Sequence, residues 1–231
     1  MSLVINNNMV TGYTKAEKHL VIPVGIRAIG KSAFRNNTEL ETLILPEGLE
    51  TIEDYAFEKC NNLKSVLFPD SLLYIGINAF SDTALVELSL PNRLERIRTG
   101  SFQCIKIKQL EFPDSLKVID PYAFFGCRQL ETIHLKKSIK SIKLCAFGYC
   151  NIQRIEIPST KISTDAFWCC EQLKEIVFIR NRLELSEKAV KKALDNHCFH
   201  FVTDCKRLFI AKESKSGQSK YFIVTPDNSD D

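Results

Sequence analysis

The sequence predicts an α/β repeat protein, mostly β, in which short turns of chain stack into a solenoid with a parallel sheet. Two observations predict this fold. The dipeptide Ala-Phe, replaced once by Ser-Phe, recurs every 20 to 23 residues. An apolar strand phrase, usually closed by Pro, lies between consecutive copies. A fixed period of this length is typical of repeat proteins, in which each unit buries its apolar face only against its neighbours.

The repeats are preceded by an N-terminal segment, about residues 1–18, which we expect to act as a cap. Residues 19–23 follow as a shortened first copy of the strand phrase. A stack of repeats needs such a cap because its first turn would otherwise expose an apolar end.

Each strand phrase is apolar at its first, fourth and sixth positions. In the copy that starts at Leu40, Leu43 and Leu45 should point into the core. Thr42 and Ile44 should point outward, because successive side chains of a strand face opposite sides. The closing Pro cannot donate to a ladder and so ends the strand. The full copies begin at Leu40, Leu63, Leu85, Ile107, Leu130, Ile152 and Leu173.

An apolar pair such as Leu49 and Ile52 follows the strand, and then comes the Ala-Phe dipeptide. The small Ala permits close approach of the backbone, while Phe is large enough to fill the space between turns. We therefore expect one continuous sheet over an unbroken core. The repeat phenylalanines are Phe34, Phe57, Phe80, Phe102, Phe124, Phe147 and Phe167.

The pattern resembles the BspA-like class of leucine-rich repeat, in which Leu-x-x-Ile-x-Ile-Pro is followed by Ile-Gly-x-x-Ala-Phe-x-x-Cys. Residues 49–60 and 116–127 match closely, and the resemblance covers roughly residues 12 to 179. It implies a right-handed leucine-rich-repeat solenoid with a curved parallel sheet. It also implies protein binding, often on bacterial or protozoan surfaces and sometimes as an adhesin.

The repeats stop near residue 179, so we expect the solenoid to span residues 1–179 and a small α+β C-terminal cap to span residues 180–225. A helix is expected over residues 186–196, where Ser186 is a suitable N-cap. The acidic tail, residues 226–231, is expected to be disordered. The alternative is that the C-terminal region is a small effector module. The expected strands are residues 199–203, 207–212 and 220–225.

Cysteines recur in register with the repeats. Cys60, Cys127, Cys150 and Cys170 each lie three residues after a repeat Phe. They could be metal ligands or redox thiols, but free Cys usually behaves as a small hydrophobe, and we expect a buried, reduced ladder. A zinc site is the alternative for one further group, which lacks a paired Cys-x-x-Cys knuckle. That group is His197, Cys198, His200 and Cys205.

Composition narrows the function classes. The 31 basic and 28 acidic residues leave a net charge of +3, which does not predict nucleic-acid binding. No apolar run approaches the roughly 18 residues of a membrane span, so no membrane insertion is expected. The start has no visible export signal, and nine cysteines suggest a reducing compartment. We therefore expect a cytoplasmic protein, or a surface or secreted one if a signal sequence was removed.

The sequence has no motif of nucleotide-binding, zinc-protease or hydrolase type. We expect no enzyme activity, cofactor or metal, and a monomer that acts as a non-catalytic scaffold for an unidentified protein partner. The rivals are a cell-surface adhesin of the same fold and a regulatory module whose C-terminal region carries the activity.

The expected contact surface is the outward face of the sheet. Val21, Ile44 and Leu67 form an apolar row on adjacent rungs, here called the apolar row. A contiguous exposed apolar row with polar neighbours is typical of a contact site. The alternative is that residues 3–13 fold over this row. The other expected contact residues are Thr42, Ser65, Glu87, Ser89, Gln109, Glu111, His134, Arg154 and Glu156.

One column of this face, Glu111, His134 and Glu156, places an imidazole between two carboxylates. Such a column could hold a cation or a proton. More often it is a solvated surface, and we expect no site there.

Overall fold

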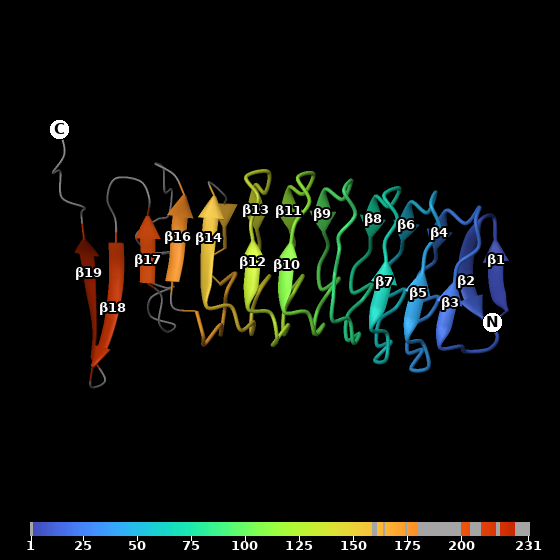
Figure 1. Ribbon diagram of the computed structural model, residues 1–231, viewed down its shortest axis with the longest axis horizontal. Coiled ribbons are helices and arrows are strands. Elements are labelled where there is room, and N and C mark those ends of the chain that lie inside the picture. Colours follow the sequence, from blue (N-terminus) through green and yellow to red (C-terminus); the bar gives the residue numbers. More distant parts are fainter. Residues whose placement is uncertain are drawn as a thin grey trace.

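The computed structural model describes residues 2–158, 161–163, 165–173, 175–179, 200–203, 209–215 and 218–224. Within these ranges the regular elements are strands, which lie side by side along the long axis of a right-handed solenoid (Figure 1). This confirms the predicted fold class.

The strand phrases form the first strip of the solenoid. Their side chains alternate as expected, with Leu43 buried and Ile44 exposed. The short strands β3, β5 and β7 pair in parallel, in register one repeat apart. The strip contains β3 (His19–Val21), β5 (Thr42–Ile44), β7 (Ser65–Leu67), β10 (Gln109–Glu111), β12 (Thr132–His134), β14 (Arg154–Pro158) and β16 (Glu175–Ile179).

The second member of each apolar pair, such as Ile52, lies in a second strip of strands, which the sequence pattern did not predict. Each strand has two residues, and the second is buried, as Ile52 is in β6, except in β15, where Ile162 is partly buried. The strip contains β4 (Ala28–Ile29), β6 (Thr51–Ile52), β8 (Tyr74–Ile75), β9 (Arg96–Ile97), β11 (Val118–Ile119), β13 (Ser141–Ile142) and β15 (Lys161–Ile162).

The N-terminal segment forms an antiparallel hairpin of β1 (Leu3–Asn6) and β2 (Met9–Tyr13). Strand β2 pairs in parallel with β4, so the hairpin extends the second strip. The alternative in which this segment covers the apolar row is therefore wrong, because it lies on the other strip and leaves the row exposed.

At the other end, β17 (His200–Thr203) pairs in parallel with β16. Strands β18 (Phe209–Lys215) and β19 (Gln218–Val224) continue the sheet in antiparallel order. The three strands lie close to the expected ranges. The expected helix at 186–196 and the tail at 226–231 lie outside the described residues.

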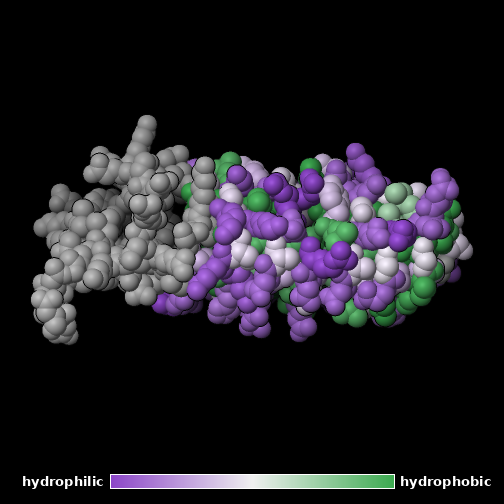
Figure 2. Space-filling model, turned by 90° about the horizontal axis from the view of Figure 1, so that it is seen from above, coloured by the Kyte–Doolittle hydropathy of each residue, from purple (hydrophilic) through white to green (hydrophobic). Residues whose placement is uncertain are grey.

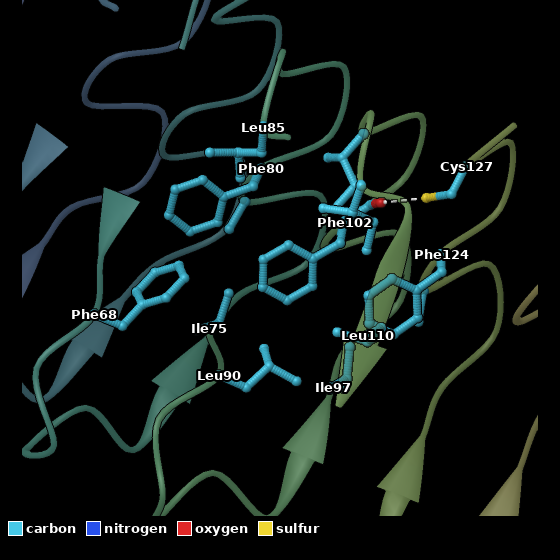
Figure 3. Packing of buried hydrophobic residues seen from close by; sticks show 14 of the residues in the cluster. Phe68, Ile75, Phe80, Leu85, Leu90, Ile97, Phe102, Leu110, Phe124 and Cys127 are labelled. Carbon is cyan, nitrogen blue, oxygen red and sulfur yellow. Dashed lines mark hydrogen bonds between the residues drawn. The ribbon is translucent and has the colours of Figure 1, made fainter. Parts of the chain in front are cut away.

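The core is a column of stacked aromatic rings, one for each turn. Tyr13 starts the column against Phe34 at 5.4 Å between ring centroids, and successive repeat Phe rings follow at 5.1 to 5.7 Å. Phe68 and Phe112 meet the column edge-on. Figure 3 shows Phe80, Phe102 and Phe124 among the aliphatic side chains of both strips. The expected role of Phe as the filler between turns is confirmed.

The expectation of one continuous sheet is wrong. In the first strip, parallel ladders join β3 to β5 and β7, β10 to β12, and β14 to β16, with breaks between these groups. Residues 85–90 have the apolar pattern of the strand phrase, but they form no strand. The second strip is also interrupted, between β8 and β9.

The breaks in the first strip follow the number of residues between each repeat Phe and the next strand phrase. Where the step is six residues, the incoming phrase pairs with the preceding one; where it is five, the ladder is broken. The steps of six lead from Phe34 to Leu40, Phe57 to Leu63, Phe124 to Leu130 and Phe167 to Leu173. The steps of five lead from Phe80 to Leu85, Phe102 to Ile107 and Phe147 to Ile152.

Backbone hydrogen bonds show how a missing residue changes the entry to the strand. After a step of six, the residue following the first Leu donates its N–H to its counterpart one turn earlier, as Lys64 does to the Glu41 carbonyl at 2.9 Å. After two of the three steps of five, the residue before the first apolar position donates instead: Lys106 donates to Leu85 at 2.8 Å and Asn151 to Leu130 at 3.0 Å. At the third, Val86 still donates to Lys64, at a longer 3.4 Å. At Lys106 and Asn151 the shorter connection thus joins the turns earlier, and at all three short steps the strands form no ladder beyond the entry.

Candidate functional site

The apolar row lies on the outward face of the first strip. Its members are side by side in the ladder, and their exposed fractions are 60% for Val21, 50% for Ile44 and 66% for Leu67. Because strand alternation directs Leu20 and Leu43 inward, these neighbours are buried while the row faces solvent. The expected position and exposure of the row are confirmed.

Polar groups border the row. His19 Nδ1 lies 2.8 Å from Thr42 Oγ1 on the neighbouring rung. Lys18 and Glu41 form an ion pair at 2.9 Å, and this partner lowers the pKa of the Glu41 carboxyl. Ser65 is also exposed. In the view from above, hydrophilic side chains cover much of the middle of the solenoid, and hydrophobic ones gather toward its N-terminal end (Figure 2).

A hollow of about 830 Å³ lies at the broken ladder between residues 86–92 and β10; we call it the first hollow. Leu88 and Leu90 contribute apolar surface, and Lys106 and Lys108 contribute positive charge. Four expected contact residues line it: Glu87, Ser89, Gln109 and Glu111.

A second hollow of about 460 Å³ lies at the next break, between β12 and β14. It is lined by the remaining expected contact residues, His134, Arg154 and Glu156. Arg154 Nη1 and Glu156 Oε1 form an ion pair at 2.6 Å across the β14 surface. The expected contact residues are therefore divided among the apolar row with its border and two separate hollows.

The carboxylate and imidazole column is only partly formed. Glu111 and His134 are ladder partners, but the ladder does not continue from His134 to Glu156. Among the residues that the structure describes, no group of three acidic, His or Cys side chains is arranged to hold a metal ion.

Sequence reasoning missed Leu88, Lys106 and Lys108 as lining residues of the first hollow. The prediction assumed that every copy of the strand phrase pairs with its neighbours in the same way. It therefore did not foresee an unpaired strand edge or the hollow beside it. The signal was present in the step of five residues from Phe102 to Ile107.

The cysteine ladder has a structural explanation. Each thiol donates a hydrogen bond to the carbonyl of the repeat Phe one turn earlier: Cys60 to Phe34, Cys127 to Phe102, Cys150 to Phe124 and Cys170 to Phe147, at 3.0 to 3.3 Å between sulfur and oxygen. Figure 3 shows the bond from Cys127.

The environment of these thiols suppresses their ionisation. Burial raises the pKa of Cys60 and of Cys170 to about 12, and raises the pKa of Cys150 well above its ordinary value. All seven cysteines in the described part of the chain are free. Three members of the zinc candidate, His197, Cys198 and Cys205, lie outside the described residues.

Stacked leucine-rich turns with an aromatic column, a thiol ladder and an open outer face define this protein as a leucine-rich-repeat solenoid. The chain belongs to the BspA type leucine rich repeat family, whose model matches residues 5–122 and 95–208 with 6 repeat copies. Among the residues that the structure describes, no helix has the length and apolar character to cross a membrane.

Solved structures share the fold. A leucine rich cell surface protein from Faecalibacterium prausnitzii has a TM-score of 0.67 and 20% identity, over 96% of this chain and 58% of the other. The leucine rich repeat protein of T. pallidum has a TM-score of 0.59 and 18% identity, over 87% of this chain and 96% of the other. This chain thus spans little more than half of the Faecalibacterium protein. No curated protein matches the sequence.

Proposed function

We propose that the protein is a non-catalytic scaffold that binds a protein partner through the outward face of its first strip. The observation that carries the proposal is the apolar row, in which Val21, Ile44 and Leu67 are each at least half exposed on adjacent rungs. Single exposed apolar residues are common on protein surfaces, whereas a contiguous row bordered by polar groups is typical of an interface.

The charges of the face support a protein partner over a nucleic acid. Lys18 is paired with Glu41, and Arg154 with Glu156. Lys106 and Lys108 form no such pair among the described residues, but they share the lining of the first hollow with Glu87 and Glu111. A nucleic-acid site would instead gather unpaired Lys and Arg side chains along the path of the phosphates. Binding by the monomer is the simplest arrangement, and the leucine-rich-repeat family typically acts through binding.

The test is the double substitution Ile44→Asp with Leu67→Asp. A partner is first captured with the intact chain and identified by mass spectrometry, and its affinity for both proteins is then measured. Two buried charges in the interface should weaken binding by at least about 100-fold. Circular dichroism and thermal melting should match the parent, because both side chains face solvent.

A matched control places the same charges elsewhere. Val24 and Leu73 are also exposed apolar residues, at 90% and 45%, and neither belongs to the apolar row. The double substitution Val24→Asp with Leu73→Asp should leave affinity unchanged. Equal affinity of the row variant and the parent would remove the row from the interface.

A surface adhesin is the second candidate, and one observation favours it: a solved structure with the same fold is described as a cell surface protein. Buried thiols with raised pKa values resist oxidation, so the cysteines are compatible with an oxidising exterior as well as with the cytoplasm. Antibody labelling of intact cells distinguishes the two locations, because a surface protein is labelled and a cytoplasmic one is not. The same face would serve the adhesin.

A further inference from the structure

Strand β10 has one paired edge and one open edge. Its paired edge forms the parallel ladder with β12. Its other edge faces residues 86–90, and no backbone hydrogen bond joins these residues to β10 in the described part of the chain. An open strand edge presents N–H and C=O groups that another extended chain can pair with.

Equivalent positions show which groups are left open. The N–H of Thr42 donates to the Lys18 carbonyl at 3.0 Å, and the N–H of Thr132 donates to the Lys108 carbonyl at 3.3 Å. Gln109 occupies the same position in its own phrase and points its N–H toward the break. Within the described residues it has no backbone acceptor there.

The space beside this edge is large enough for a ligand. The first hollow measures about 830 Å³, within the range of roughly 300–1,000 Å³ that is usual for ligand pockets. Leu88 and Leu90 form an apolar part of its lining. The hollow therefore offers backbone groups on one wall and apolar contacts on another.

Charge indicates the chemistry of the occupant. On the paired edge, β12 carries His134 opposite Glu111, and Glu131 directly before β12 follows Lys108 in the preceding turn. A parallel chain on the open edge would meet the same Lys108 and Glu111 side chains. Its best match is an acidic residue near the start and a basic residue three positions later, with an apolar residue between them.

We propose that the first hollow binds an extended peptide segment of a partner protein, which adds a parallel strand to the open edge of β10. The preferred segment has the pattern acidic, any residue, apolar, basic. The proposal rests on the proposed protein-binding function and assigns it a second contact point. This contact is separate from the apolar row, so each can fail without the other.

The probe is a synthetic peptide with the sequence of residues 129–136, the chain around β12, because it already fits the other edge of β10. Fluorescence anisotropy of the labelled peptide should show saturable binding to the intact protein. A peptide with the positions of Glu131 and His134 changed to Lys and Glu should bind about tenfold more weakly. A peptide with methylated backbone nitrogens should not bind, because it cannot complete the ladder.

A pair of proline variants tests the edge in the protein itself. Gln109→Pro removes an N–H that has no ladder partner, so folding stability should change little while peptide affinity falls about tenfold. Thr132→Pro removes an N–H that is bonded to Lys108, and thermal melting should show clear destabilisation. Amide exchange in the parent protein, with and without peptide, should show fast exchange at Gln109 that the peptide slows.

Three results would overturn the proposal. One is that the peptide does not bind and that amide exchange at Gln109 is either slow already in the protein alone or the same with and without peptide. Another is equal binding of the charge-reversed peptide or equal affinity of the Gln109→Pro variant. The third is protection of Gln109 by dimerisation at high protein concentration, which would assign the edge to a second copy of this chain.

Discussion

Two residue types hold neighbouring turns together through complementary contacts. Each repeat Phe stacks on the next, and each ladder Cys donates its S–H to the carbonyl of the Phe one turn earlier. The ring supplies dispersion and apolar burial. The thiol adds a donor from the next turn to a carbonyl that, in Phe34, Phe124 and Phe147, already accepts a backbone N–H within its own turn. Because each ladder Cys bonds to a repeat Phe of the preceding turn, the Phe and Cys positions recur together.

Removal of one ring tests the column. Phe124 is fully buried, and its ring lies 5.6 Å from Phe102 and 5.4 Å from Phe147. Phe124→Ala should lower the free energy of unfolding by about 3–5 kcal/mol, because the cavity opens between turns with no other core. Chemical denaturation measures the loss. Phe125→Ala is the matched control, since this ring is only half-buried and should cost less; a loss below about 1 kcal/mol for Phe124→Ala would contradict the column.

The buried thiols make the free energy of unfolding fall as the pH rises through the alkaline range. Folding raises the pKa of Cys60 and Cys170 from 9.0 to about 12, so the folded state keeps protons that the unfolded state loses. Their contribution is complete below pH 9 and is lost as pH rises toward 12, at about 1.4 kcal/mol per pH unit for each thiol.

The measurement is the unfolding free energy from denaturant titrations between pH 8 and about 11. The variant with Cys60→Ser and Cys170→Ser has no thiol to ionise at these positions and should show a shallower decline. Identical slopes for the two proteins would contradict the raised pKa values.

At the scale of elements, the length of a connection decides whether two strands pair. Period-two alternation correctly predicted that Leu43 faces inward and Ile44 outward, because that pattern is local. The second strip was not predicted, since its two-residue strands are too short to show alternation. Residues 85–90 have the apolar pattern of a strand phrase, yet the step of five residues keeps them out of the ladder.

An inserted residue should repair a break. Ile105 is buried three residues after Phe102, as Cys60 is after Phe57, so an Asn inserted between Ile105 and Lys106 would restore the step of six. Pairing of β10 with the preceding turn should then slow amide exchange at Gln109 by about tenfold and close the first hollow. Hydrogen exchange detected by NMR measures the change.

The same Asn inserted between Cys127 and Arg128 is the control. It lengthens a step that already has six residues and should speed exchange in β12 by disturbing an intact ladder. Unchanged amide exchange at Gln109 in the first variant would show that the length of the connection does not cause the broken ladder.

At the scale of the whole molecule, the number and order of turns could be read from the Ala-Phe period, because each turn meets only its neighbours. The apolar row followed from that order, since register places Val21, Ile44 and Leu67 together. The hollows did not follow, because they arise where two neighbouring turns differ. Between β8 and β9 both strips are broken, and the Phe80 to Phe102 stack and the bond from Phe80 N–H to the Ser101 carbonyl still connect the turns.

The dependence of pairing on one residue gives this architecture a simple route to variation. Deletion of a single codon between a repeat Phe and the next strand would break the ladder at that turn, and two of the three such breaks in this chain carry a hollow, while the aromatic column behind them persists. Gain of a codon would close one. Genes for such proteins can therefore move a surface hollow along the solenoid through small in-frame changes, without exchanging any residue of the core.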